Sequence, residues 1–202
     1  NPNLTELELN KTANELYSKH STTDIDEYPC LYVGTYRKYN NGSIYGTWVN
    51  LSSFENAEEY YRYIKLVHSD EEVPEYMYQD ECNIINYSEC MSINDDTIAF
   101  YKELNELQKQ EKEAFKQFIE GRGYEINENT IEEARDHFHG IYDTKKDFYE
   151  SMVFDGSFNP GYENFKELYD NGWIDEERLE TELDFEFTSY PVSNYQVAMF
   201  HD

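Results

Sequence analysis

The chain has 202 residues, and its 43 acidic and 16 basic residues give a formal net charge of −27. Its 20 tyrosines and 12 phenylalanines argue against wholesale disorder, and the length suits one large domain or two to three small ones. Such acidity disfavours direct binding to nucleic acids or to anionic membranes, so cations or a basic protein surface are the natural partners.

The chain begins with a short predicted helix. Thr5 and Glu8 have the spacing of a capping box, and leucines recur at helical intervals, which predicts a helix over residues 4–18. A polar linker over residues 21–27 is expected to follow this helix.

The next segment, YVGTYRKYNNGSIYGTWVNL, contains no acidic residue although the chain as a whole is strongly acidic. Apolar residues alternate over 31–36, which indicates a strand, and a turn-forming sequence follows at Asn40–Ser43. Residues 44–49 would form the second strand, so the segment predicts a β-hairpin. Arg37 and Lys38 are expected to face inward or to pair with nearby acids. The aromatic residues expected to pack as the scaffold of the hairpin are Tyr32, Tyr36, Tyr45 and Trp48.

Helix and strand signals alternate after the hairpin. Ser52 and Glu55 have capping spacing, which predicts a helix that runs to about Val67. The segment EYMYQDEC, residues 75–82, predicts a third strand.

The following part of the chain is predicted to be helical. One long helix is expected over residues 97–120, with Gly121 as its stop. Its apolar face would be formed by Phe100, Leu104, Leu107, Phe115 and Phe118. Further helices are predicted to begin at Thr130 and Thr144 and to cover residues 162–170 and 175–184.

Two strands, over residues 185–190 and 195–200, are predicted to close the chain. The coarse order is therefore β-rich, then helical, then mixed. This order predicts an α+β fold.

The three cysteines, Cys30, Cys82 and Cys90, have no metal-ligand spacing, and their odd number argues against a disulfide framework. They are interpreted as reduced thiols of a cytosolic protein. No apolar run approaches the roughly 18 residues of a membrane span, and no signal-peptide pattern is visible.

Candidate catalytic and metal-binding motifs do not form a complete site in the sequence. His137 and His139 would point in different directions on a helix, and Glu133 has no second Glu-x-x-His element for a di-iron site. The Gly-Arg-Gly at 121–123 lacks the third glycine of a dinucleotide-binding motif. Asn94–Asp96 suits a helix N-terminus better than a calcium loop. No enzyme activity, metal or cofactor is therefore expected.

The acidic residues are spread over the chain beyond residue 50. Residues 51–100 hold 12 acids and 2 bases, residues 101–150 hold 13 and 8, and residues 151–202 hold 12 and 2. Their interleaving with apolar residues is typical of a folded acidic surface. Since duplex DNA carries one charge per ~1.7 Å, an excess of 27 charges matches ~46 Å of duplex, or ~13 base pairs. Carboxylates four residues apart on a helix, or two apart on a strand, lie ~6 Å apart.

Individual acids are also compatible with plain solvated faces, and the whole composition is compatible with adaptation to high salt. A net charge of magnitude about 2 to 8 suffices for the solubility of a small domain, which favours a functional role for the excess. The acids predicted to imitate DNA phosphates are Glu55, Glu58, Glu59, Asp70, Glu71, Glu72, Glu75, Asp80, Glu81, Asp95, Asp96, Glu132, Glu133, Asp175, Glu176, Glu180, Asp184 and Glu186.

Several motifs resemble those of ArdA-type antirestriction proteins. The acid-free segment resembles the start of that family, and EYMYQDEC resembles its next strand. FHGIYDTKKDFYESMV resembles its Gly-x-Tyr-x-(Ser/Thr)-x-x-Asp-Phe segment, and LYDNGWIDEERLETELDFEF and YQVAMF follow in family order. The resemblance covers residues 31–202, whereas residues 1–27 look like an extension.

The resemblance implies an elongated series of three small domains that imitates bent B-form DNA and has neither a catalytic site nor a cofactor. It implies inhibition of type I restriction–modification enzymes through their DNA-binding groove, in the cytoplasm of a bacterial host. The alternative is an acidic module that binds another basic DNA-binding protein, such as a CRISPR effector or a nucleoid protein.

The resemblance also implies a homodimer that forms through the last domain. The expected contacts are Val192, Tyr195, Val197, Met199 and Phe200. The expected parts of the chain are an N-terminal extension (1–28), a β-rich domain (29–95), a central helical domain (96–134) and an α/β dimerisation domain (135–202).

Overall fold

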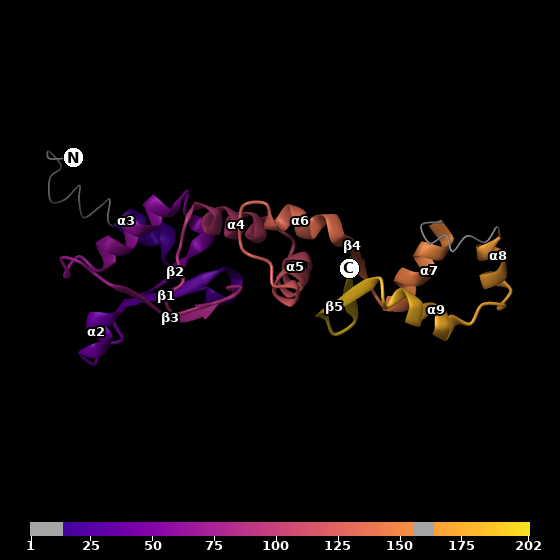
Figure 1. The fold of residues 1–202 in the computed structure, drawn as a ribbon. Helices are drawn as coiled ribbons and strands as arrows, with labels where there is room; N and C mark the ends of the chain where they lie inside the picture. The colour runs from indigo at the N-terminus through magenta and orange to yellow at the C-terminus, as the bar shows by residue number, and fades with distance from the viewer. Residues whose placement is uncertain (1–13, 156–163) are drawn as a thin grey trace. The chain divides into compact units, whose positions relative to one another are not determined.

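The computed structural model of the chain describes residues 14–155 and 164–202 (Figure 1). Its helices and two small antiparallel sheets confirm the predicted α+β class. The chain divides into two compact units, and the division into three domains is not confirmed. Of the described residues, unit 1 comprises those up to Leu107 together with Tyr124–Ile131, and unit 2 comprises Gln108–Gly123 together with those from Glu132 onward.

The sheet of unit 1 has the strand order β2-β1-β3, with every pair antiparallel (Figure 1). Its strands are β1 (Cys30–Thr35), β2 (Thr47–Asn50) and β3 (Tyr76–Cys82). Two strands of the expected hairpin, β1 and β2, do pair with each other, and the third strand lies where the sequence predicted it. Tyr32 and Trp48 contact edge to face across the pair, with ring centroids 5.4 Å apart.

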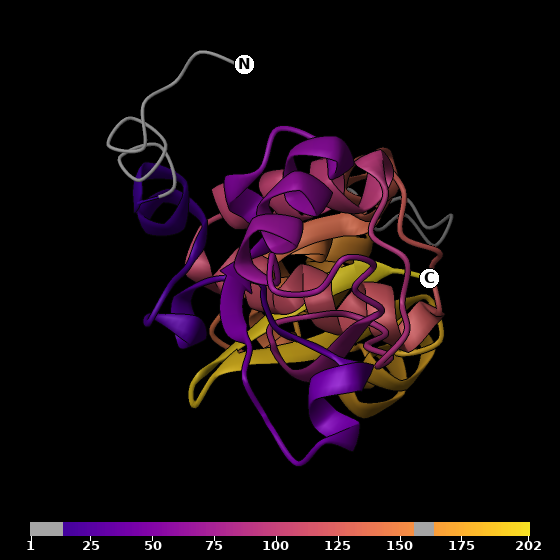
Figure 2. The same cartoon turned by 90° about the vertical axis from the view of Figure 1, so that its left-hand side faces the viewer.

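The connection between β1 and β2 differs from the predicted tight turn. A short helix, α2 (Tyr36–Asn40), begins directly after β1, because the Thr35 side chain accepts a hydrogen bond from the Lys38 backbone and caps it. Both views show α2 projecting from the sheet (Figures 1 and 2). Tyr45 in the following loop is 55% exposed, so it is not part of a packed scaffold.

Helices cover the sheet of unit 1 and supply most of its aromatic core. A 3-10 helix, η2 (Leu51–Ser53), precedes α3 (Ala57–Val67), and the side chain of Asn56 caps α3 where Ser52 was expected to do so. The helix α4 (Asp95–Glu106) begins at a capping box formed by Asn94 and Thr97. The fully buried side chains include Phe54, Tyr60, Tyr63, Ile64, Phe100 and Tyr101.

The N-terminal helix is described only in part. Residues 14–20 are helical, and the rest of the predicted helix, residues 4–13, lies outside the described residues. Another 3-10 helix, η1 (Ile25–Glu27), occupies part of the expected linker.

The predicted single helix over residues 97–120 is wrong, because the structure contains two helices there. Leu107 and Gln108 adopt extended backbone angles, with ψ of 151° for both, and they separate α4 from α5 (Lys109–Arg122). The break lies at the boundary between the two units, so the helices pack into different cores. The stop of α5 is Gly123, whose φ of 67° favours glycine, and not Gly121.

The sheet of unit 2 has the strand order β4-β6-β5 and is antiparallel throughout. Its strands are β4 (Phe138–Tyr142), β5 (Phe187–Ser193) and β6 (Gln196–His201). The strands β5 and β6 confirm the two predicted at the end of the chain, whereas β4 was not predicted. It directly follows α6 (Thr130–His137), a helix that begins where Thr130 predicted it.

The other helices of unit 2 lie close to their predicted positions. They are α7 (Lys145–Asp155), α8 (Phe165–Asp170) and α9 (Glu176–Leu183). Thr144 precedes α7 and exchanges hydrogen bonds with Asp147, as its spacing predicted. Residues 162 and 163, expected at the start of α8, lie outside the described residues.

Unit 2 is held together by two groups of apolar side chains. Phe118 of α5 stacks on Phe200 of β6 with ring centroids 4.3 Å apart, and Phe115 and Phe138 contact the same phenylalanine ring. The second group includes Phe148, Met152, Leu183, Phe187 and Met199. Over the described ranges, no helix combines the length and apolar character that crossing a membrane requires.

Candidate partner-binding surface

The acids predicted to imitate phosphates are mostly at the surface. Fourteen of them are exposed, namely Glu55, Glu58, Asp70, Glu72, Glu75, Asp80, Asp95, Asp96, Glu132, Glu133, Asp175, Glu176, Asp184 and Glu186. Glu59, Glu81 and Glu180 are half-buried. Glu71 differs from all the others, because it is buried.

Glu71 is part of an internal network in unit 1. Its carboxylate accepts a hydrogen bond from Thr35 Oγ1 at 2.6 Å and lies 3.0 Å from Lys38 Nζ. The hydrogen bond from Thr35, together with Lys38, lowers the pKa of Glu71, although burial acts in the opposite direction. Lys38 also pairs with Asp70 at 2.8 Å, which confirms the expected pairing of this lysine. Because its carboxylate is enclosed, Glu71 cannot present its charge to a partner.

Several of the predicted acids are neutralised by lysines distant in sequence. The two residues of each pair are about 30 to 47 positions apart in the sequence, so sequence spacing could not reveal the pairing. The pairs are Glu55–Lys102 at 2.8 Å, Glu59–Lys19 at 2.9 Å, Asp184–Lys145 at 2.8 Å and Glu176–Lys146 at 2.9 Å. These carboxylates contribute less to the field outside the protein than the unpaired ones do.

Backbone groups hold several of the predicted acids in place. Asp95 accepts a hydrogen bond from the Ala57 backbone at 2.8 Å, and Asp175 caps α9 through the Arg178 backbone at 3.1 Å. The side chain of Glu81 accepts from the backbone of the residue three positions later. Backbone donors orient these carboxylates without cancelling their charge.

A group of unpaired acids lies along the outer strand of the sheet in unit 1. Because β3 is an edge strand, its outer side is open to other segments. The loop after β3 returns to it: the Tyr78 backbone donates to the Glu89 carbonyl at 3.1 Å, and Tyr87 Oη donates to the Tyr78 carbonyl at 2.5 Å. We call the acids along this strand and in its returning loop the β3 acidic edge, and they are Glu75, Asp80, Glu81 and Glu89.

Two phenols beside the β3 acidic edge are each influenced by more than one of its charges. The pKa of Tyr87 is raised, first by burial and then by the charges of Asp80, Glu89 and Glu81. The pKa of Tyr36 is also raised, by burial and then by a set of neighbours that includes Glu89 and Glu75. None of these four acids forms an ion pair with a described residue. Sequence reasoning missed Glu89, because it is an isolated acid in a loop and only the fold brings it to β3.

Unit 2 carries its own unpaired acids. Glu132 and Glu133 lie in the first turn of α6, where a negative charge interacts favourably with the helix dipole. Glu180 lies on α9, and Glu186 lies just before β5. Among the described residues none of the four has an ion-pair partner, so their charges add to the acidic surface.

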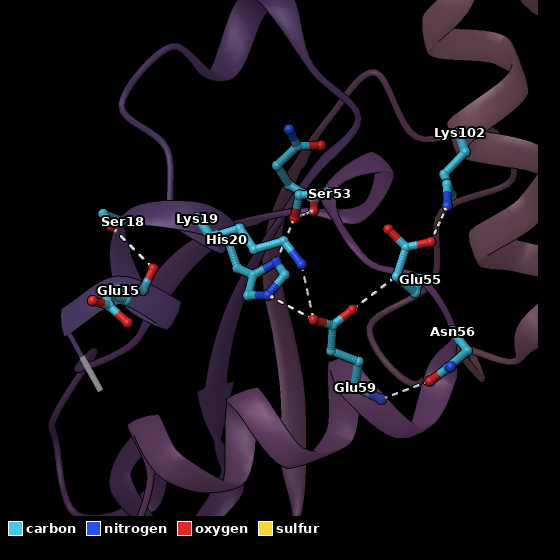
Figure 3. A network of polar contacts seen from close by, with 10 residues as sticks. Glu15, Ser18, Lys19, His20, Ser53, Glu55, Asn56, Glu59 and Lys102 are labelled. Carbon is cyan, nitrogen blue, oxygen red and sulfur yellow. Dashed lines mark hydrogen bonds and ion pairs between the residues drawn. The ribbon is translucent and has the colours of Figure 1, made fainter. Parts of the chain in front are cut away.

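A buried histidine network in unit 1 resembles a catalytic triad but is arranged differently (Figure 3). His20 Nδ1 lies 2.8 Å from Ser53 Oγ, and His20 Nε2 lies 3.4 Å from the Glu59 carboxylate. Ser53 Oγ also lies 2.7 Å from the Asn50 carbonyl, to which it donates its proton. In a catalytic triad the serine proton goes to the histidine instead.

The same network anchors the N-terminal helix. His20 is completely buried and stacks on Phe54 with ring centroids 4.0 Å apart. Lys19, the preceding residue, pairs with Glu59 of α3, and Glu59 also accepts a hydrogen bond from the Glu55 backbone (Figure 3). Residues 14–20 are therefore built into unit 1, a role that the sequence did not suggest for the expected extension.

Unit 1 should lose stability as the pH falls from 7 to 5.5, because of two buried histidines. Burial and the neighbouring Lys19 lower the pKa of His20 despite Glu59, and burial and Lys38 lower that of His68 despite Asp70 and Glu71. The unfolded chain, in which histidine titrates near about 6.5, then binds more protons than the folded chain. Stability is therefore fully present above about 6.5 and decreases below it.

Urea unfolding followed at several pH values measures this dependence. His20→Phe removes one of the two titrating groups and should flatten the slope between about pH 6.5 and 5. His201→Gln, at an exposed position, serves as the control and should leave the slope unchanged. An equal slope in His20→Phe and the unaltered protein would contradict the assignment.

The residues expected at a dimer interface do not share one surface. Met199 and Phe200 are fully buried in β6, which is the central strand of its sheet. Tyr195, in the turn between β5 and β6, is 83% exposed. Val192 and Val197 are half-buried. Of the five, Tyr195 is the residue best placed to contact another molecule.

The histidine pair considered as a metal site is divided between two elements. His137 ends α6, and its Nδ1 lies 2.9 Å from the His201 carbonyl. His139 lies on β4 beside Phe148 and Phe187. Within residues 14–155 and 164–202, no group of three or more histidine, cysteine or acidic side chains is arranged to hold a metal ion.

The chain matches a known protein family. The sequence profile described as "Antirestriction protein (ArdA)" matches residues 31–194. No curated protein matches the chain. The matched range covers most of both units and excludes residues 14–20, which hold His20.

Proposed function

We propose a specific activity for this chain, which belongs to the ArdA antirestriction family. It inhibits type I restriction–modification enzymes by occupying their DNA-binding groove as a DNA mimic. Membership of the family implies an antirestriction function. The identity of the target and the mode of inhibition are the proposal. The observation that supports it best is the β3 acidic edge, where Glu75, Asp80, Glu81 and Glu89 remain without basic partners.

The placement of these acids suits a basic protein groove. Asp80 and Glu81 lie on a strand that pairs along its length with β1, so their backbone is held by the sheet. Glu89 is held to the same strand through its backbone carbonyl. Carboxylates on a fixed backbone lose little entropy when they meet lysines and arginines, so the attraction is retained as affinity.

The distinction between paired and unpaired acids sharpens the proposal. The paired set includes Glu55, Glu59, Glu176 and Asp184, and the buried Glu71 is excluded from contact. The set proposed to face the partner is Glu58, Glu72, Glu75, Asp80, Glu81, Glu89, Asp95, Asp96, Glu132, Glu133, Asp175, Glu180 and Glu186. Its members combine exposure or partial exposure with the absence of an ion pair among the described residues.

Inhibition should be stoichiometric and should leave the DNA intact. A mimic acts by occupancy, so about one equivalent of inhibitor per binding groove should be needed. The test is a titration of a purified type I enzyme at concentrations well above the dissociation constant, with the DNA product analysed on a gel. Complete inhibition at a small fraction of one equivalent, or a covalent change in the enzyme, would refute the mimic proposal.

We further propose that the protein is a homodimer formed by unit 2. The exposed Tyr195 and the edge strands β4 and β5 support this arrangement, since β6 is already paired on both sides. Two chains would together match roughly 90 Å of duplex in charge.

Analytical ultracentrifugation should detect the dimer at micromolar concentration. Tyr195→Glu should shift the protein toward the monomer by placing a charge in the contact. Tyr39→Glu, at an exposed tyrosine of unit 1, is the control and should leave the dimer intact. If the unaltered chain is a monomer at this concentration, the proposed dimer is wrong. The proposed inhibition is tested separately by the titration.

A further inference from the structure

Two of the three cysteines face each other across the sheet of unit 1. Cys30 on β1 is the direct partner of Cys82 on β3 in the antiparallel register. Directly opposed residues of antiparallel strands point to the same face of the sheet, with Cβ atoms about 4.5–5.5 Å apart. Both thiols are reduced in the structure, and Cys90 is in the loop beyond β3.

We infer that Cys30 and Cys82 form a reversible cross-strand disulfide when the protein meets a peroxide. The Cα separation of opposed residues on paired strands, about 4.5–5.5 Å, lies within the range of about 4.4–6.8 Å found in disulfides. A small approach of the two Cβ atoms, to about 3.8 Å, completes the geometry. The sheet register therefore already supplies most of what the bond requires.

The surroundings of the two thiols indicate which of them reacts first with the peroxide. Cys82 is half-buried, whereas Cys30 is fully buried, so a peroxide reaches Cys82 first. The Cys82 thiol donates to the carboxylate of Asp26 at 3.7 Å, so Asp26 can accept its proton. Burial, and secondarily Cys82, raises the pKa of Cys30 to about 12, so Cys30 stays a thiol while Cys82 is oxidised.

The chemistry consumes one peroxide for each disulfide. The sulfur of Cys82 attacks the peroxide, the O–O bond breaks, and a sulfenic acid and one water are formed. The sulfur of Cys30 then attacks the sulfur of Cys82. The S–O bond breaks, and the hydroxyl group leaves as a second water with the proton of the Cys30 thiol. The two thiols together supply the two electrons, and an external dithiol returns them.

The bond would fasten β1 to β3 next to the β3 acidic edge. Cys82 directly follows Glu81, so the crosslink would fix the end of the strand that carries Asp80 and Glu81. Because it would close a long loop, the oxidised protein should unfold several degrees above the reduced protein.

The test uses the full chain with Cys90→Ser, which removes the exposed thiol and the crosslinks between chains that it would form. The reduced protein is treated with hydrogen peroxide, remaining thiols are alkylated under denaturing conditions, and the peptides are mapped by mass spectrometry. We expect a peptide pair that joins residues 30 and 82, a mass lower by two hydrogen atoms, full reversal by dithiothreitol and a raised melting temperature.

Cys82→Ser in the same background is the control, because Cys82 is half-buried and its replacement should be tolerated. This variant should form no crosslink, and Cys30 should remain alkylatable after peroxide. The inference is overturned if Cys82 proceeds to a sulfinic acid while Cys30 stays alkylatable, or if both thiols survive peroxide unchanged. The peptide mapping of the Cys90→Ser protein is sufficient to show whether the disulfide forms. The test therefore remains valid even if the control variant folds poorly.

Discussion

Reversing Asp80 and Glu89 together to lysine should weaken inhibition of a type I enzyme by roughly 30-fold, because each reversal removes an attraction and adds a repulsion. Both acids belong to the β3 acidic edge and have no basic partner among the described residues. Either reversal alone should weaken inhibition by only about 5-fold, since a single exposed charge contributes little.

The matched control is the reversal of Glu55 and Asp70 in the same unit. It changes the net charge by the same amount, but both acids are already paired, with Lys102 and Lys38. We expect a loss of only a few fold. Inhibition titrations of both double variants, with circular dichroism to verify the fold, measure the difference. Equal losses would mean that net charge alone matters and that the β3 acidic edge is not a distinct contact.

Phe118→Ala should destabilise unit 2 by about 3–4 kcal/mol, because it removes a fully buried ring and leaves a cavity. The ring stacks on Phe200 and contacts Tyr190 at its edge, so α5 would lose part of its contact with the sheet. Urea unfolding provides the measurement. Phe154→Ala, at a residue 47% exposed, is the control and should cost less than about 1 kcal/mol.

The same variant tests whether α5 belongs to unit 2 and not to a central domain. Trp48 lies in unit 1 and Trp173 in unit 2, so Trp173→Phe leaves fluorescence that reports on unit 1 alone. In that background, Phe118→Ala should shift the circular dichroism transition more than the Trp48 transition. Equal shifts of the two signals would contradict the division into units.

Elements with a local signal were predicted well from the sequence. The strand β3 and the helices α7 and α9 have capping residues or alternation within their own segments, so their positions needed no knowledge of the fold. The break between α4 and α5 had no such signal, since Leu107 and Gln108 are ordinary helix formers. That break follows from the packing of the two helices in different units, which the sequence pattern does not contain.

The candidate surface shows the same distinction at the level of single residues. Composition was sufficient to predict an acidic surface, but it could not show which charges are cancelled. Glu71 follows Asp70 directly in an acidic tract, yet the fold encloses it with Thr35 and Lys38. Glu89 has no acidic neighbour in sequence, yet the loop after β3 brings its backbone to Tyr78 of that strand. Ion pairs and the path of the loop after β3 both depend on the tertiary structure. Together they determine which acids are proposed to contact the partner.

The proposal that this protein occupies the DNA-binding groove of a type I enzyme can be tested by competition with DNA. A fluorescently labelled target duplex is bound to a purified type I enzyme, the protein is added, and the anisotropy of the duplex is followed. If the protein is a DNA mimic, the duplex should be released as the protein binds, and excess unlabelled duplex should reverse the release. A complex in which the enzyme holds the duplex and the inhibitor together, with cleavage blocked, would contradict it.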